Sequence, residues 1–162
     1  YFSAFPGYYF SGDGCYKNEE GMFRITGRVD DVLIVSGHNL GTAEIESAID
    51  EHKNVCESAI VGYPHNIKGN GICAFIICHH TPSDPLKLNV EINKLIVKHV
   101  GPIAKLDKIQ YVVGLPKTRS GKIMRRILRK IASGETKNLG DTSTLLDPSV
   151  VQSIIQGSIN SN

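Results

Sequence analysis

The stretch "VLIVSGHNLGTAEIESAIDEHKNVCESAIV", residues 32–61, contains two strand-like apolar runs with a helix-like pattern between them. The run 32–35 predicts a buried strand that ends in a Ser-Gly turn. Thr42 is a suitable N-cap for a helix that continues through His52, because apolar residues recur there on one face. The run 58–61 predicts the next strand. This order of strand, helix and strand indicates a sheet with helices packed on it.

The same alternation continues toward the C-terminus. We expect a strand at 72–78, a helix at 88–100 and a strand at 109–113. The segment after Gly121 predicts an amphipathic helix whose arginines point outward. Its expected inward residues are Ile123, Ile127, Leu128 and Ile131. Together these elements predict an α+β fold, a small domain whose central sheet is flanked by helices.

The residues before Arg28 have a different character. Short apolar runs at 8–11, 15–17 and 22–25 are separated by the turn formers "GDG" and "NEEG", which predicts a β hairpin. We therefore divide the chain into 1–29, the β-rich end of a large preceding domain, 30–133, a compact domain, and 134–162, a polar tail with a weak helix. Because the chain opens with neither a positively charged segment nor a cleavage pattern, we interpret it as a piece of a longer protein and not as a signal peptide.

Positive charge gathers in "PKTRSGKIMRRILRK", residues 116–130, which holds seven of the 18 Lys and Arg residues and no acidic residue. The other 11 basic residues are outnumbered by 16 acidic ones, and the net charge is only +2. The net charge therefore gives no support to a general nucleic-acid-binding function, which would rest on Arg125, Arg126 and Arg129 alone. A solvated basic helix face explains the same pattern more simply.

Composition argues against several other classes of protein. No apolar run approaches the roughly 20 residues that span a bilayer, so we expect no membrane segment and a cytoplasmic location. The cysteines form no CxxC pair and have no His at zinc-finger spacing. We expect buried, reduced thiols at Cys15, Cys56, Cys73 and Cys78.

Lys122 is the first candidate functional residue. The segment "GLPKTRSGKI" is not a Walker phosphate loop, because six residues separate Gly114 from Gly121 and Ile123 replaces the required Ser or Thr. It is a glycine-hinged loop that we expect to present Lys122 at a helix N-terminus, where backbone N–H groups favour an anion. A lysine placed there could hold a phosphate and a carboxylate together.

Two further motifs carry charges near the domain boundary. In "YFSGDG", Asp13 could accept hydrogen bonds from the paired hydroxyls of a ribose, although Asp is common in turns for structural reasons. In "TGRVDD", Arg28 stands beside Asp30 and Asp31 at the expected boundary. Taken alone, these charges indicate a solvated linker.

Taken together, "YFSGDG", "ITGRVDDVLIVSGHNLGTAEIE" and "PKTRSGKIMRRILRK", in this order and spacing, resemble the C-terminal part of the adenylate-forming acyl-CoA synthetases. The tail "NLGDTSTLLDP" is more similar to the acetate-activating members than to the wider family. Such enzymes form an acyl-adenylate from ATP and a carboxylate, then rotate the C-terminal domain and transfer the acyl group to CoA. The resemblance therefore implies a ligase whose substrates are acetate, ATP and CoA.

The resemblance also implies residue roles. Lys122 would be the lysine of adenylation, Asp13 would bind the ribose hydroxyls of ATP with Arg28 beside it, and Asp30 would be the hinge of the rotation. Ser36 and Gly37 would line the pantetheine passage of CoA. A Mg²⁺ ion is implied at the end of the following helix, where its residues would be Asp50, His52 and Val55. A helix end without metal is an equally good interpretation of those three residues.

Two positions depart from the family pattern. Asn39 takes the cofactor-binding position at which an arginine commonly reaches the phosphates, and Val97 stands where an arginine commonly meets the CoA 3′-phosphate. The neighbouring Lys98 could replace the second arginine only as a point charge, without its bidentate fork.

Three alternatives to an acetate–CoA ligase stay open. They are a propionate-activating relative, a basic nucleic-acid-binding module, and an interaction domain without catalysis. We expect this chain alone to be inactive, because the phosphate loop and the acyl pocket of the large N-terminal domain are not in its sequence. Lys122, exposed in one conformation and essential in the other, would be open to lysine acetylation enzymes.

Overall fold

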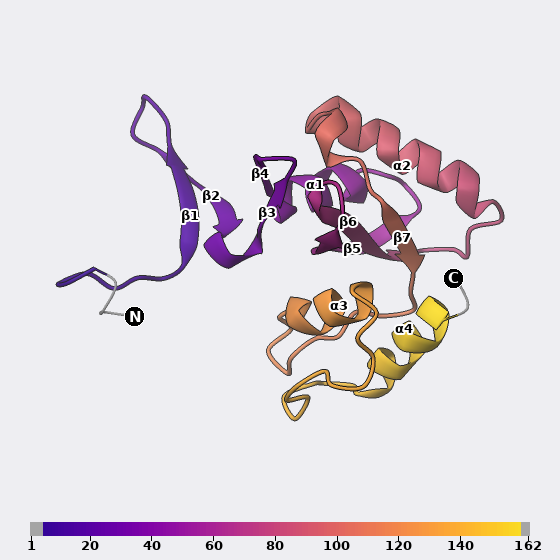
Figure 1. Ribbon diagram of the computed structural model, residues 1–162. Coiled ribbons are helices and arrows are strands. Elements are labelled where there is room, and N and C mark those ends of the chain that lie inside the picture. The colour runs from indigo at the N-terminus through magenta and orange to yellow at the C-terminus, as the bar shows by residue number, and fades with distance from the viewer. Residues whose placement is uncertain (1–4, 160–162) are drawn as a thin grey trace.

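The computed structural model describes residues 5–159, and at its centre lies a five-stranded sheet (Figure 1). Its strands are β3 (Val32–Val35), β4 (His38–Gly41), β5 (Val55–His65), β6 (Gly69–Cys78) and β7 (Lys108–Tyr111). Strands β5 and β6 form a long antiparallel hairpin. On the other side of β6, Val35 of β3 pairs antiparallel with Gly69, the first residue of β6. Strand β7 runs parallel to β6 farther along the same side. Strand β6 is therefore the centre of the sheet.

Both faces of this sheet are covered by helices (Figure 1). Ile60 and Ile76 share a core with α1 (Thr42–Asp50) and α2 (Pro85–His99). Val61 and Phe75, their neighbours along the strands, pack instead with α3 (Arg125–Ala132) and α4 (Ser149–Ile159). Because successive residues of a strand point to opposite faces, the β5–β6 hairpin needs cover on both sides. The predicted α+β class, a sheet flanked by helices, is confirmed.

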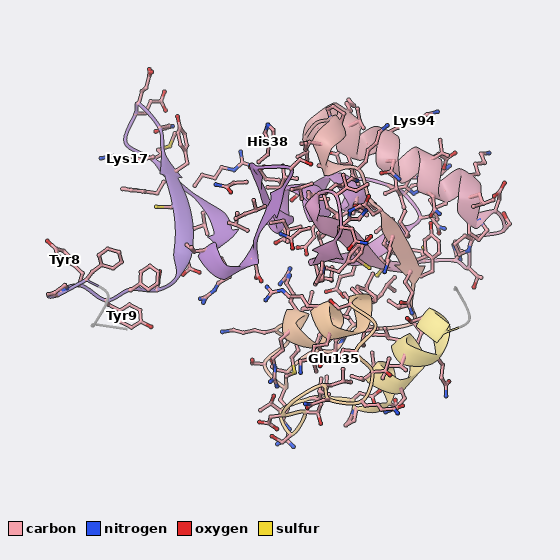
Figure 2. All side chains as sticks on the ribbon, in the orientation of Figure 1. Tyr8, Tyr9, Lys17, His38, Lys94 and Glu135 are labelled. Atoms are coloured by element: carbon pink, nitrogen blue, oxygen red, sulfur yellow. The ribbon has the colours of Figure 1, made fainter. Side chains whose placement is uncertain are left out.

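The N-terminal strands form a separate hairpin, β1 (Asp13–Lys17) and β2 (Phe23–Arg28), which extends away from the sheet (Figure 1). The expected strand at 8–11 is wrong, since these residues pair with no strand in the described part of the chain, 5–159. Figure 2 shows Tyr8 and Tyr9 pointing away from the rest of the molecule, and their exposures are 76% and 62%. An apolar run is an insufficient signal for a strand when no neighbour completes its hydrogen-bond ladder.

Strand β4 was not expected from the sequence. Ser36 and Gly37 have φ values of 49° and 81°, so both turn residues are left-handed and join β3 to β4 as a tight hairpin. The Ser-Gly turn is thus confirmed. Only Leu40 of β4 is buried, whereas His38 and Asn39 are exposed, so the strand has no apolar run that would have revealed it.

The starts of α1 and α3 differ from the expected capping pattern, whereas α2 only begins three residues earlier than expected, at Pro85. Gly41, and not Thr42, is the N-cap of α1, and the side chain of Thr42 is buried. Helix α3 begins at Arg125, while Ile123 forms a β-bridge with Lys117 ahead of it. The first residues of α1 and α3 therefore follow from burial and local backbone pairing, and not from the capping pattern in the sequence.

The cysteines are all free, but only some are buried. Cys73 lies inside the α3–α4 core, where burial raises its pKa to about 12, and Cys78 is half-buried. Burial was the wrong expectation for Cys15 and Cys56, which are exposed. Cys56 follows the buried Val55 in β5, at an irregularity in the β5–β6 register. Among residues 5–159, no helix is long and apolar enough to cross a membrane.

Two replacements in α2 test this packing. Ile96 is fully buried, so Ile96→Ala should lower the free energy of unfolding by roughly 2–5 kcal/mol. Leu86, which is 77% exposed, is the matched control, and Leu86→Ala should change it by less than about 0.5 kcal/mol. Urea unfolding measures both, and equal losses would contradict the assignment of the helix face.

Candidate functional site

Lys122 lies on a tight loop ahead of α3. The Gly121 N–H donates to the carbonyl of Thr118 at 2.9 Å, and the Thr118 N–H donates to the carbonyl of Lys122 at 2.8 Å. The Lys122 N–H in turn donates to the Thr118 hydroxyl at 3.1 Å. Gly121 has φ of 83°, a conformation that suits glycine. The expectation that Lys122 stands at the helix N-terminus is wrong, because backbone pairing holds its loop before α3 begins.

Most of the other basic side chains of 116–130 have partners within the chain. The partners are Glu57 for Lys117, Glu46 for Arg125, Asp31 for Arg129, the Asp141 carbonyl for Arg126 and the Asn138 carbonyl for Lys130. Only Arg119 and Lys122 of this group have side chains that make no hydrogen bond or ion pair with residues 5–159, and both are exposed. Lys122 is thus available to an external anion.

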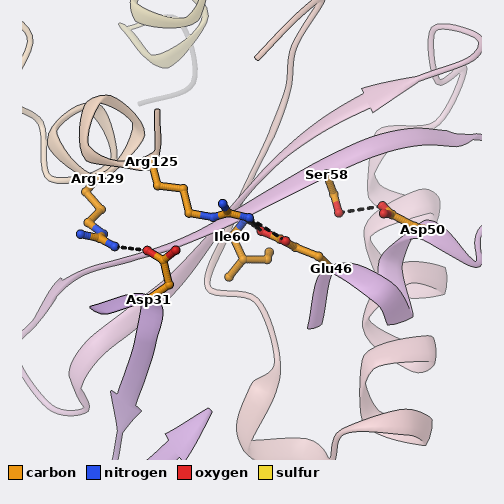
Figure 3. Close-up of polar contacts among 7 residues, drawn as sticks. All are labelled: Asp31, Glu46, Asp50, Ser58, Ile60, Arg125 and Arg129. Carbon is orange, nitrogen blue, oxygen red and sulfur yellow. Dashed lines mark hydrogen bonds and ion pairs between the residues drawn. The ribbon is translucent and has the colours of Figure 1, made fainter. Parts of the chain in front are cut away.

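Arg125 and Glu46 form an ion pair that joins α3 to α1 (Figure 3). One guanidinium nitrogen donates to both carboxylate oxygens at 2.8 Å, and Glu46 also accepts the Ile60 N–H of β5 at 2.8 Å. Burial raises the pKa of Glu46 and outweighs the attraction of Arg125. Desolvation therefore offsets much of the attraction, and the pair mainly fixes how the two helices meet.

A second ion pair joins Arg129 of α3 to Asp31 (Figure 3). Asp31 ends the short 3-10 helix Val29–Asp31, which contains the expected hinge residue Asp30. The expectation that the arginines of this helix point outward is thus wrong for Arg125 and Arg129. Their long side chains reach carboxylates that the fold brings close.

These pairings were missed because their members are far apart in the chain. Glu46 and Arg125 are 79 residues apart, and Asp31 and Arg129 are 98 apart. No local spacing predicts which carboxylate a given arginine will reach. The only sequence signal was the acidic excess outside 116–130, which implied that acceptors existed somewhere.

Asp13 and Arg28 are brought together at the open end of the β1–β2 hairpin. They are direct strand partners, with 3.6 Å between an Arg28 guanidinium nitrogen and an Asp13 carboxylate oxygen. The same nitrogen of Arg28 donates to the Ser11 carbonyl at 2.9 Å. Gly12, between Ser11 and Asp13, has φ of 78°, a conformation that favours glycine, and a Cβ there would lie 2.9 Å from the flexible end of the Arg28 side chain. The pair lies on the hairpin, apart from the Lys122 loop (Figure 1).

The expected CoA-facing residues lie on another edge of the domain. Ser36, Gly37 and Asn39 are exposed around the β3–β4 turn, beside His38 (Figure 2). Val97 is half-buried on α2, whereas Lys98 is exposed. The described residues therefore form separate sites for Asp13 with Arg28, for Lys122 and for the β3–β4 turn.

The expected Mg²⁺ residues do not offer a ready cation site. The Asp50 carboxylate accepts the Ser58 hydroxyl at 2.8 Å, and burial raises its pKa. Both ring nitrogens of His52 are engaged, Nε2 with Glu91 and Nδ1 with the Asn54 N–H, each at 3.2 Å. No group of three His, Cys, Asp or Glu residues within 5–159 could hold a metal. Mg²⁺ favours oxygen ligands, so these side chains do not fit it as they stand.

Comparison with known families and relatives gives consistent results. Residues 44–122 match the AMP-binding enzyme C-terminal domain. Acetyl-coenzyme A synthetase from Magnetococcus marinus is 62% identical over 96% of this chain, and that from Halorhodospira halophila is 57% identical over 99%. The chain spans 24% and 25% of the length of these two relatives.

Solved structures show the same fold. The anthranilate CoA ligase AuaEII in complex with anthranoyl-AMP is 32% identical, with a TM-score of 0.69 over 76% of this chain and 24% of its own. The ATP-bound MatB from Rhodopseudomonas palustris is 28% identical, with a TM-score of 0.65 over 75% of this chain and 24% of its own.

Charge replacement tests the Arg125–Glu46 pair. Glu46→Gln keeps an acceptor for the Ile60 N–H but leaves the half-buried guanidinium of Arg125 without its carboxylate, so it should lower the free energy of unfolding by roughly 1–3 kcal/mol. Adding Arg125→Met should recover part of that loss. Arg119→Met, on an exposed side chain, is the control and should be nearly neutral. Urea unfolding of Glu46→Gln, Arg125→Met, the double variant and Arg119→Met would contradict this account if the losses of the first two variants simply added in the double variant.

Proposed function

We propose that this chain is the C-terminal part of an acetate–CoA ligase, because it belongs to the adenylate-forming acyl-CoA synthetases through its AMP-binding enzyme C-terminal domain. It would work with a large N-terminal domain that supplies the acyl pocket and the phosphate loop. The observation that carries the proposal is the Lys122 ammonium, which is exposed and unpaired among residues 5–159, whereas most other cations of the basic segment 116–130 are engaged. Relatives 57–62% identical over nearly the whole chain support acetate as the acid.

In the proposed first step, a carboxylate oxygen of acetate attacks the α-phosphate of ATP, and pyrophosphate leaves. Negative charge then accumulates between two anions, and the Lys122 ammonium would stabilise it without rearrangement of solvent. Asp13 would accept hydrogen bonds from the ribose hydroxyls, with Arg28 holding it in place across the hairpin. Mg²⁺ bound with ATP would supply further phosphate neutralisation.

In the proposed second step, the domain rotates about Asp30 and the CoA thiol attacks the acetyl carbonyl, so that AMP leaves. Ser36 and Gly37 would then line the pantetheine passage, which their exposed turn allows. Asn39 would contribute a neutral hydrogen bond in place of a charged phosphate contact.

We also propose residues 1–29 as part of the large domain and 30–133 as the mobile domain. Support comes from the exposed apolar side chains of the β1–β2 hairpin, which include Tyr16, Phe23 and Ile25 at 60–66% exposure. Surface of this kind is typical of a segment that packs against another body. Residues 134–162, proposed as the tail, contribute α4 to the core of the mobile domain.

Regulation by lysine acetylation is a further part of the proposal. Lys122 is exposed, so a modifying enzyme would reach it when the domain is rotated away from ATP. Acetylation removes the positive charge on which adenylation would depend.

Lys122→Ala tests the proposal in the full-length ligase. Acetate-dependent pyrophosphate exchange should fall on the order of 10²-fold or more, because one preorganised charge is lost. Thioester formation from acetyl-adenylate and CoA should stay near normal. Arg119→Ala, from the same loop and equally exposed, should leave both half-reactions nearly unchanged. An equal loss of both half-reactions in Lys122→Ala would refute the adenylation role.

Asp30→Pro tests the hinge separately. Proline fixes φ near −65°, which would block the second conformation, so thioester formation should fall while pyrophosphate exchange is retained. Proportional loss of the two activities would instead indicate general damage at the boundary.

A further inference from the structure

The tail of the chain pairs with the loop that carries Lys122. Leu145 forms an antiparallel β-bridge with Thr118, on the opposite side from the bridge between Lys117 and Ile123. The Leu146 N–H donates to the Lys117 carbonyl at 2.9 Å, and the Arg119 N–H donates to the Thr144 carbonyl at 3.3 Å. The leg 117–119 of the loop is therefore held between Ile123 on one side and residues 144–146, the tail strand, on the other.

The tail strand is itself anchored to the core. Leu145 is 4% exposed and packs in the same cluster as Met124 and Ile127. The Thr144 hydroxyl lies 3.8 Å from the Met124 sulfur. Beyond the strand, α4 buries Val151 and Ile154 on the sheet. The tail strand therefore joins the Lys122 loop to the hydrophobic core.

Basic side chains of α3 hold the incoming part of the tail. Arg126 donates to the carbonyl of Asp141, and Lys130 donates to the carbonyl of Asn138. These contacts are charge-assisted hydrogen bonds to backbone oxygens, which restrict the path of residues 138–141. The tail is thus tied to the helix before the strand and to the core after it.

We propose that the tail strand is a positioning element that holds the Lys122 loop in the geometry used for adenylation. This inference rests on the proposed function of Lys122. A lysine on a freely moving loop would lose conformational entropy each time it bound ATP and acetate. A displacement of its ammonium by about 1 Å can also lower the reaction rate roughly 10²-fold. The backbone bonds to residues 144–146 remove that freedom in advance.

Leu146 provides a matched pair of variants. Its side chain is 67% exposed, but its N–H bonds to the Lys117 carbonyl, so Leu146→Pro removes that donor while Leu146→Ala keeps it. Amide hydrogen exchange of this chain should become at least tenfold faster at Thr118, Arg119 and Lys122 in Leu146→Pro. Leu146→Ala should exchange like the parent chain, and exchange in β6 should be unchanged in both variants.

Activity in the full-length ligase completes the test. In Leu146→Pro, kcat for acetate-dependent pyrophosphate exchange should fall roughly 10-fold to 100-fold with little change in KM for ATP, while thioester formation from acetyl-adenylate is kept. Leu145→Ala, which weakens the buried anchor, should show the same pattern to a smaller extent, and it replaces the proline variant if that one does not fold.

The outcomes separate the two hypotheses. Unchanged hydrogen exchange in the loop, or normal pyrophosphate exchange in Leu146→Pro beside a strong loss in Lys122→Ala, would overturn the positioning role alone. Equal loss of both half-reactions in Leu146→Pro would also overturn it, because a general structural defect explains that result. Undiminished pyrophosphate exchange in Lys122→Ala would instead overturn the proposed function on which this role rests.

Discussion

Burial of the central strand on both faces is the constraint from which the rest of the domain follows. Along β6, Ile72, Ala74 and Ile76 turn to one side and Cys73 and Phe75 to the other, and none is more than 3% exposed. One pair of helices cannot cover both sides, so α1 and α2 take one face while α3 and α4 take the other. The C-terminal helix is thus part of the core, and the loop before α3 is held close to the segment that leads into α4.

The distribution of charge follows from this packing. Helix α3 carries closely spaced basic residues onto the sheet, where Arg125 and Arg129 meet carboxylates from α1 and from the segment at the domain boundary. Partly buried charges are costly unless they are paired, which accounts for these contacts. Lys122 lies outside the helix on the exposed loop, and its side chain makes no hydrogen bond or ion pair with residues 5–159. The same basic segment therefore performs a structural task along the helix and, in our proposal, a chemical one at the loop.

Several elements were predictable because their signals are local. The apolar runs at 32–35 and 72–78 lie within the observed β3 and β6, and the helices expected at 42–52 and 88–100 correspond to α1 and α2. The strand expected at 58–61 is the buried middle of β5, which extends to Val55–His65 because β6 pairs with the residues on either side as well. Strand β4 gave no apolar signal, and the run 8–11 gave a false one.

The sequence by itself determined the fold class, the resemblance to the acyl-CoA synthetases and the identity of Lys122, Asp13 and Arg28 as candidates, because each rests on periodicity or on motifs read within short windows. Only the tertiary structure decided that Arg125 and Arg129 are paired with carboxylates, that Asp13 and Arg28 face each other, and that the tail strand pairs with the Lys122 loop. Those contacts join residues from 15 to 98 positions apart. Which of many possible partners meet is set by how the helices close over the two faces of the sheet, and no local pattern carries that information.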